Sequence, residues 1–152
     1  MVYWIIIMLT FLIDQFSKFL IEKHFPLGYS KEMLKHLLWL TYVQNTGGAF
    51  SILEGKQFIF IVVSIILIIG LFWLLIFKKL SNPSKLSIAL ILGGALGNLF
   101  DRVFRGYVVD FIDIKVIPVF NIADTCITIG VFLLALEFLR EGRGELLQKK
   151  GI

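Results

Sequence analysis

Residues 58–77 read FIFIVVSIILIIGLFWLLIF, twenty residues without a charge, with Lys56 before them and Lys78 and Lys79 after them. A helix of about 20 apolar residues crosses the hydrocarbon core of a bilayer. Basic residues just outside such a stretch are typical of the boundaries of a span. The sequence therefore predicts a transmembrane helix at residues 58–77.

The composition of the whole chain is that of an integral membrane protein. Of its 152 residues 58% are hydrophobic and 14% are aromatic, and the mean hydropathy is +0.88. Soluble domains contain about 45–50% apolar residues. Three further stretches are long and apolar enough to cross a bilayer, at residues 2–21, 86–104 and 119–139. We expect a single domain, residues 1–152, that is an all-α membrane protein with four transmembrane helices.

The first of these stretches has a cleaved signal peptide as its alternative. A signal peptide needs a basic N-terminal region and a cleavage site of small residues, and residues 1–13 have neither. We therefore expect a retained helix. Asp14 and Lys18 are four residues apart, so they lie on one face of this helix, where pairing lowers the cost of burying either charge.

Basic residues near the spans predict the orientation in the membrane. They crowd the connection between the second and third stretches and the C-terminal tail, at Lys78, Lys79, Lys85, Arg140, Arg143, Lys149 and Lys150. Such segments are cytoplasmic as a rule, so we expect both termini inside and residues 22–57 and 105–118 outside. The sequence pI of about 9.3 follows from this topology, and we expect no nucleic-acid partner.

The two outer segments have the composition of short strands. Residues 37–43 (LLWLTYV) are rich in strand formers, and residues 45–48 (NTGG) are a turn signal. Residues 49–53 can then run back along the membrane surface. Residues 106–109 (GYVV) and 111–114 (FIDI) are also strand-like. We expect these pieces to form a small extracytoplasmic β-sheet over the helix ends.

The chain offers no residue pattern typical of a cofactor site. Cys126 is its one cysteine, and the two histidines, His24 and His36, lack the spacing of metal ligands. We interpret Cys126 as a small buried hydrophobe. Gly93 and Gly97 form a GxxxG pair inside a span, which favours close helix packing over phosphate binding. No metal and no organic cofactor are expected.

Polar residues of the third stretch recur with helical spacing. Gly94, Asn98 and Arg102 follow one another at intervals of four, and Asp101 comes three residues after Asn98. Such residues can share one face of a helix, and we expect this face to point toward protein rather than lipid. Two interpretations stay open, a polar seam that packs helices together or part of a functional site.

Asp110 and Asp124 flank the beginning of the last apolar stretch. Ionisable residues in such places mark functional sites by default, but Asn121 and Asp124 also have the spacing of a helix cap and its reciprocal carboxylate. A helix N-terminus stabilises an ionised carboxylate, whereas apolar surroundings and a second carboxylate raise a pKa. These opposed influences can leave one aspartate charged and the other protonated, as catalysis by two carboxyl groups requires.

Taken one at a time, these residues allow more than one class of protein. A proton relay or small transporter would use Asp14, Asp101, Asp110 and Asp124 at several depths of the bilayer, and an assembly protein would use the polar residues for packing alone. Three of the four aspartates map to the outer side. This distribution argues against a continuous path across the membrane.

Five motifs in chain order carry a resemblance to a known family. They are Asp14 with Lys18 and residues 45–50 (NTGGAF), 97–102 (GNLFDR), 108–111 (VVDF) and 120–124 (FNIAD). In these motifs the chain resembles the lipoprotein signal peptidases, or signal peptidase II, which are bacterial membrane aspartic proteases. The resemblance implies four helices with a small extracytoplasmic sheet in the plasma membrane. It also implies an endopeptidase that removes signal peptides from diacylglyceryl-modified prolipoproteins, cleaving before the lipidated cysteine.

The same resemblance implies a role for each motif. Asp110 and Asp124 would form the catalytic dyad, with no cofactor. The residues that would position the substrate are Asn45, Gly47, Asn98, Arg102 and Asn121. Structural support would come from Asp14, Lys18 and Asp101. The expected partners are prolipoprotein substrates and membrane lipids, and the expected state is a monomer.

Overall fold

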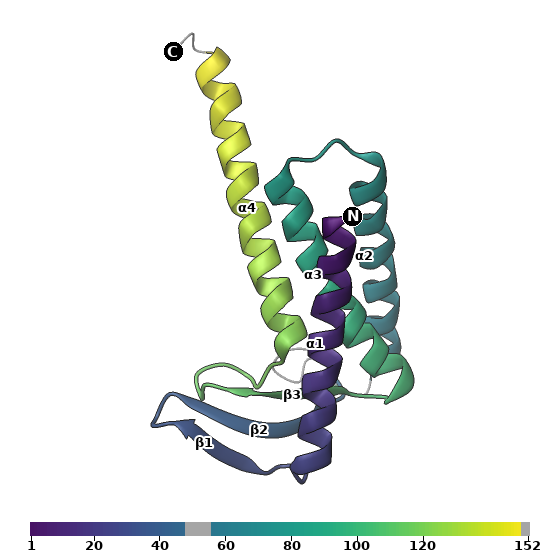
Figure 1. Cartoon of the computed structure of the whole chain (residues 1–152), viewed down its shortest axis with the longest axis vertical. Helices are drawn as coiled ribbons and strands as arrows, with labels where there is room; N and C mark the ends of the chain where they lie inside the picture. Colours follow the sequence, from purple (N-terminus) through teal and green to yellow (C-terminus); the bar gives the residue numbers. More distant parts are fainter. Residues whose placement is uncertain (48–55, 150–152) are drawn as a thin grey trace.

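Four long helices form the body of the part of the chain that the computed structural model describes, residues 1–47 and 56–149. They are α1 (Val2–His24), α2 (Gln57–Phe77), α3 (Asn82–Phe104) and α4 (Ile122–Lys149). Each contains a stretch long and apolar enough to cross a membrane. The helices stand side by side, with a small sheet at one end, while α1 begins and α4 ends toward the other (Figure 1). The predicted fold class is confirmed.

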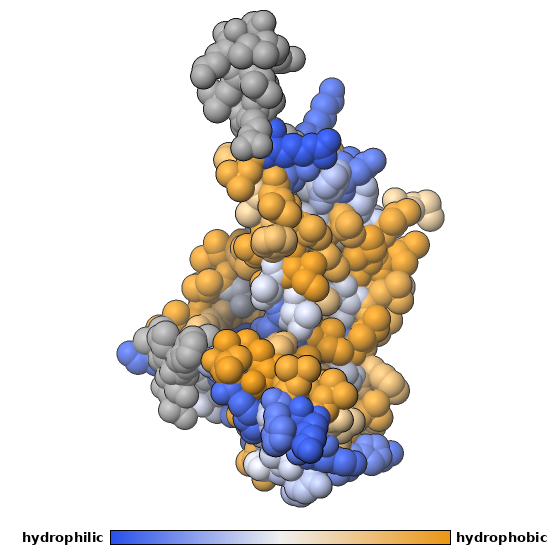
Figure 2. All heavy atoms as spheres, turned by 90° about the vertical axis from the view of Figure 1, so that its left-hand side faces the viewer, coloured by the Kyte–Doolittle hydropathy of each residue, from blue (hydrophilic) through white to orange (hydrophobic). Residues whose placement is uncertain are grey.

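The outer surface of the bundle is apolar. Hydrophobic side chains cover its middle on the face that Figure 2 shows, and hydrophilic side chains gather toward both ends. Large apolar residues of α2 and α4 are widely exposed, among them Ile66 at 65% and Phe132 at 62%. An apolar surface this extensive is unfavourable in water. It fits a bundle whose surroundings are lipid chains.

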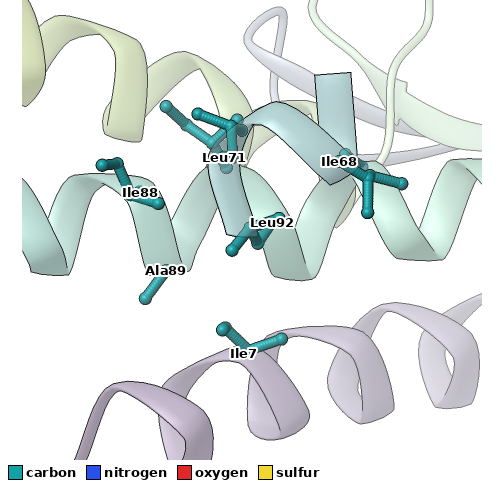
Figure 3. Packing of buried hydrophobic residues seen from close by; sticks show 8 residues of the cluster. Ile7, Ile68, Leu71, Ile88, Ala89 and Leu92 are labelled. Atoms are coloured by element: carbon teal, nitrogen blue, oxygen red, sulfur yellow. The ribbon is translucent and has the colours of Figure 1, made fainter. Parts of the chain in front are cut away.

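The central helix is α3, which packs against α1, α2 and α4. Its glycines lie where neighbouring helices approach most closely. A Cβ atom on Gly93 would lie 2.6 Å from Cβ of Thr10 in α1, and one on Gly97 would collide with the Asp14 carboxylate. The predicted close packing at the GxxxG pair is confirmed. Larger apolar residues fill the rest of this interface, with Leu92 facing Ile7 and Leu71 (Figure 3).

Helices α3 and α4 begin several residues away from the predicted positions, for local reasons. Helix α3 begins at Asn82 rather than at residue 86, because the Ser81 side chain accepts a hydrogen bond from the Ser84 N–H at 3.2 Å and Pro83 occupies the first turn. Helix α4 begins at Ile122 rather than at residue 119. The helix begins later because Phe120 pairs with Ile112 as an isolated β-bridge.

The sheet has three antiparallel strands in the order β1 (Ser30–Leu34), β2 (Leu38–Asn45) and β3 (Val108–Asp113). Strand β1 was not predicted. All its side chains are exposed, so it has no alternation of buried and exposed residues for the sequence to reveal. Of the strand-like residues 106–109 and 111–114, those at 108–113 form the single strand β3. The surface segment expected at residues 49–53 lies outside the described residues.

Apolar contacts hold the sheet against the end of α1. Val109 and Phe111 of β3 pack with Tyr42 of β2 and Ile21 of α1. The Tyr107 hydroxyl also donates a hydrogen bond to Glu22 at 3.1 Å. Because Val109 and Phe111 point toward this core, Asp110 between them points to the opposite face of the sheet.

We predict that Gly94→Ala destabilises the bundle. A Cβ on Gly94 would collide with the Ala123 carbonyl oxygen and lie 2.8 Å from Ile127, and overpacking of this kind costs about 1–3 kcal/mol. We expect a lower thermal unfolding midpoint in detergent. The matched control is Gly70→Ala in α2, where a Cβ would have no neighbour within 4 Å. Equal midpoints for the two variants would contradict this account of the α3–α4 contact.

Candidate active site

A buried lysine connects α1 and α3 close to the sheet. The Lys18 ammonium lies 2.8 Å from Asp14, 2.8 Å from Asp101 and 2.9 Å from the Asn98 side-chain oxygen. Lys18, Asp14 and Asp101 are fully buried. An ammonium group has three hydrogens and no acceptor, so these three oxygens match its whole capacity. The predicted pairing of Asp14 with Lys18 is confirmed.

The first turn of α4 is fixed by two side chains. The Asn121 side-chain oxygen accepts a hydrogen bond from the Asp124 N–H at 2.8 Å, and the Asp124 carboxylate lies 3.4 Å from the Asn121 N–H. This is the reciprocal cap that the sequence allowed. The Asp14 carboxylate of α1 accepts from the Ala123 N–H at 2.9 Å. The position of Asp124 therefore depends on α1 as well as on its own helix.

Asp110 is held by two amide side chains. Asn45 of β2 donates to one carboxylate oxygen at 2.9 Å, and Asn121 donates to the other at 2.7 Å. Asn45 is itself oriented, because its oxygen accepts from the Gly47 N–H at 2.9 Å. These contacts join the turn after β2 to the beginning of α4. The Asp110 carboxyl group is 2% exposed as a result.

Asp110 and Asp124 line one cavity of about 390 Å³. Asn98 donates to Asp124 at 2.7 Å, and Asn121 contacts both aspartates. The remaining wall has a polar part from Asn45 and Arg102 and an apolar part from Val108 of β3 and from the β3–α4 connection. The apolar residues are Val108, Ile117, Pro118, Val119 and Phe120. Sequence reasoning missed the apolar wall of residues 117–120, which has no motif of its own.

Arg102 and Asp101, neighbours in sequence, face different parts of the molecule. Arg102 lines the cavity, with its guanidinium carbon 5.2 Å from the centre of the Phe60 ring and long hydrogen bonds to backbone carbonyl oxygens. Asp101 instead faces α1, where it pairs with Lys18, and it also pairs with Arg105 at the end of α3. The predicted orientation toward protein is confirmed for Asn98 and Asp101, which are buried and share Lys18. Asn98 and Arg102 line the cavity, whereas Asp101 does not.

Gln15 and Arg105 also belong to the polar cluster, and neither residue was predicted, because neither belongs to a recognisable motif. The Gln15 amide nitrogen donates at 3.1 Å to the Asp14 and Asp101 carboxylates and to the Gly97 carbonyl. Its oxygen accepts from Arg105 at 2.8 Å. Gln15 and Arg105 complete the hydrogen bonding of the buried Asp14 and Asp101 carboxylates. These contacts lower the cost of burying the two charges.

The electrostatics of the cavity favour a protonated Asp110. Burial raises its pKa, and the negative charge of Asp124 raises it further, to about 7. The hydrogen bonds from Asn45 and Asn121 act in the opposite direction. Asp124 lies at a helix N-terminus and accepts a hydrogen bond from Asn98, both of which stabilise an anion. The site can therefore hold one proton between its two carboxyl groups near neutral pH.

A cavity with two differently held carboxyl groups, inside a bundle with membrane-spanning helices, defines a multi-pass membrane enzyme. The family model for signal peptidase (SPase) II matches residues 6–140. The chain therefore belongs to the signal peptidase II family and is a protease. The resemblance found in the sequence motifs is confirmed.

Individual relatives match over nearly the whole chain. The lipoprotein signal peptidase of Caldicellulosiruptor bescii is 61% identical over 150 residues, which cover 99% of each chain. That of Halalkalibacterium halodurans is 38% identical over 94% of this chain and 95% of its own. A bacterial membrane enzyme solved by the in meso method superposes with a TM-score of 0.89 at 36% identity, over 93% of this chain and 89% of that one.

We predict a pH-dependent effect of Asp110→Asn on stability. Folded Asp110 keeps its proton up to about pH 7, whereas an unperturbed aspartate loses it near 3.8. Between these values the folded state binds the extra proton, so wild-type stability falls as the pH rises. The variant lacks this titration. The melting temperature of the variant minus that of the wild type should therefore increase from about pH 4 to about pH 7 and then level off.

Asp113→Asn is the control for this experiment. Asp113 lies on the same strand, but hydrogen bonds from Lys115 and Thr41 outweigh burial and lower its pKa. Its titration therefore lies below the window, and the melting difference for D113N should stay constant across it. A constant difference for D110N as well would show that Asp110 does not titrate near neutral pH.

Proposed function

We propose that the chain is an aspartic endopeptidase that removes signal peptides from diacylglyceryl-modified prolipoproteins, cleaving before the lipidated cysteine. In this proposal Asp110 and Asp124 are the catalytic dyad. The observation that carries it is their arrangement, because two carboxyl groups from different elements line one cavity and share Asn121 as a hydrogen-bond partner. Membership of the signal peptidase II family supports the substrate class.

The two carboxyl groups take different roles in this mechanism. Asp124, as the anion, accepts a proton from a water molecule that attacks the scissile carbonyl carbon. Asp110, as the acid, donates its proton to the carbonyl oxygen, which its pKa of about 7 permits. The tetrahedral intermediate then collapses: the C–N bond breaks, the leaving amine takes the proton held by Asp124, and one hydroxyl of the intermediate returns its proton to Asp110. Hydrolysis by this route needs no metal and no organic cofactor.

In this proposal, polar residues of the cavity wall bind the peptide backbone of the substrate, and apolar residues make its apolar contacts. Asn45 and Arg102 line the cavity with polar groups that suit an extended peptide backbone. Gly47 holds both side chains, because its N–H donates to Asn45 and its carbonyl oxygen accepts from Arg102. Ile117 and Val119 offer apolar contacts. The acyl chains on the substrate cysteine can stay among membrane lipids, so only the scissile bond has to reach the dyad. The dyad and its partners belong to one chain, which supports a monomer as the active unit.

We propose that the sheet and the dyad lie on the extracytoplasmic side, with both termini cytoplasmic. The basic residues Lys78 and Lys79 lie on the α2–α3 connection, at the end of the bundle away from the sheet (Figure 1). Positive charge beside a span is typical of the cytoplasmic side.

This topology predicts the labelling of two introduced cysteines. In a Cys126→Ala background, a membrane-impermeant maleimide added to intact cells should label Lys35→Cys on the β1–β2 turn but not Lys79→Cys. Both positions are exposed. Permeabilised cells, in which both should react, provide the control for reactivity. The reverse pattern would overturn the orientation.

We predict that Asp110→Asn and Asp124→Asn each abolish cleavage of a diacylglyceryl-modified precursor in detergent. Each removes a group whose proton transfer contributes about 10²–10⁴-fold to the rate. Asp113→Asn is the matched control, because Asp113 pairs with Lys115 and does not line the cavity, and it should retain most of the activity. Size-exclusion profiles establish that all three variants are folded. Full activity in either dyad variant would end the proposal.

The relay alternative has less support from the described residues. Asp14 and Asp101 share the buried Lys18 ammonium, and Asp110 and Asp124 lie beside them near the sheet. Toward the other end, Glu137 accepts a hydrogen bond from Ser81. Proton flux through the protein in sealed vesicles, lost in Asp124→Asn, would favour the relay instead.

A further inference from the structure

We propose that Lys18 is a positioning residue for catalysis, which fixes the side-chain amide of Asn98 in the orientation that donates a hydrogen bond to Asp124. The inference rests on the proposed role of Asp124 and assigns a function to a buried charge that the mechanism does not otherwise use. Lys18 does not line the cavity. Its hydrogen-bonded path to Asp124 runs through Asn98, and its charge also acts directly on Asp110, whose pKa it lowers.

The hydrogen-bonding capacity of the two side chains fixes the amide orientation. Lys18 can only donate, and two of its three hydrogens go to the Asp14 and Asp101 carboxylates. The third requires an acceptor, so the oxygen of the Asn98 amide faces the ammonium at 2.9 Å. In a planar amide the nitrogen then lies on the other branch. There it donates to Asp124 at 2.7 Å.

The Lys18 ammonium adds to the contacts that disfavour the opposite amide orientation. A flipped Asn98 would place its NH₂ group against the Lys18 ammonium and its oxygen against the Asp124 carboxylate. Without Lys18, the carboxylates of Asp14 and Asp101 would attract the amide hydrogens. Removing the lysine therefore weakens the electrostatic preference that keeps a donor on Asp124.

The same oxygen of Asn98 also receives a hydrogen bond from Asn121, at 3.1 Å. The Asn121 amide nitrogen donates to Asp110 at 2.7 Å as well. The Asn121 nitrogen can contact both the Asn98 oxygen and the Asp110 carboxylate because the Asn98 oxygen points toward it. One buried ammonium thus orders the donors to both carboxyl groups, and donors and acceptors in such a chain reinforce one another.

A double-mutant cycle separates positioning from a purely structural role. The variants are Lys18→Met, Asn98→Ala and the double variant, assayed with a synthetic diacylglyceryl-modified precursor peptide in detergent. We expect each single variant to lower kcat by about 10- to 100-fold with little change in KM. The double variant should be no slower than Asn98→Ala. If the two losses multiply in the double variant, Lys18 does not act through Asn98 and the inference is wrong.

A charge-balanced version keeps the test valid if Lys18→Met does not fold. Asp14→Asn combined with Lys18→Met removes one charge of each sign, and Asp101 keeps Arg105 as its partner. Asparagine at residue 14 also retains an oxygen for the Ala123 N–H. Asp14→Asn then serves as the reference protein, and Lys18→Met and Asn98→Ala are added to it singly and together. The two losses in kcat should again be non-additive.

Two further variants complete the design. Lys23→Met changes an exposed lysine on the same helix and should leave kcat unchanged. Asp124→Asn separates the two proposals. Activity retained in Asp124→Asn overturns the proposed dyad, whereas an inactive Asp124→Asn with an additive cycle overturns only the positioning role of Lys18.

Discussion

The burial of the Lys18 ammonium is the constraint on which the arrangement of the helices depends. An unpaired charge in such surroundings costs about 3–5 kcal/mol, so its acceptors have to stay in place together. They come from α1 and α3, and Asp14 extends the same network to the backbone of α4. Three helices are thereby fixed relative to one another near the sheet. Apolar packing alone does not hold the helices in one arrangement as strongly, since lipid chains are as apolar as the helix surfaces.

Close approach of the helices makes this network possible. The glycines of α3 remove the side chains that would separate it from α1 and α4, and Gly97 leaves room for the Asp14 carboxylate itself. The sheet then adds the second aspartate from a different direction. Its core with Ile21 turns Val109 toward α1 and leaves Asp110 facing Asn121. The proposed dyad is thus assembled from a helix start and a strand.

Amide side chains, rather than ion pairs, surround the two aspartates. Asn45, Asn98 and Asn121 each donate to one carboxyl group and accept from another donor. Because amides carry no net charge, they orient the carboxyl groups without forcing both to ionise. Such an environment allows the pair to keep one proton near neutral pH. Lys18 lies behind these amide side chains. In our proposal it orients the Asn98 amide, and so sets the direction of the hydrogen bond from Asn98 to Asp124.

The sequence by itself determined the membrane class, the four spans, the Asp14–Lys18 pair, the Asn121–Asp124 cap and the family. Each of these follows from apolar length, from spacing within one helix or from motifs in chain order. Only the tertiary structure decided that Asn98, 80 residues after Lys18, joins it to Asp124, and that Asp101 turns away from the cavity. Residue spacing specifies neighbours within an element, whereas contacts between elements depend on how closely and at what angle the elements pack.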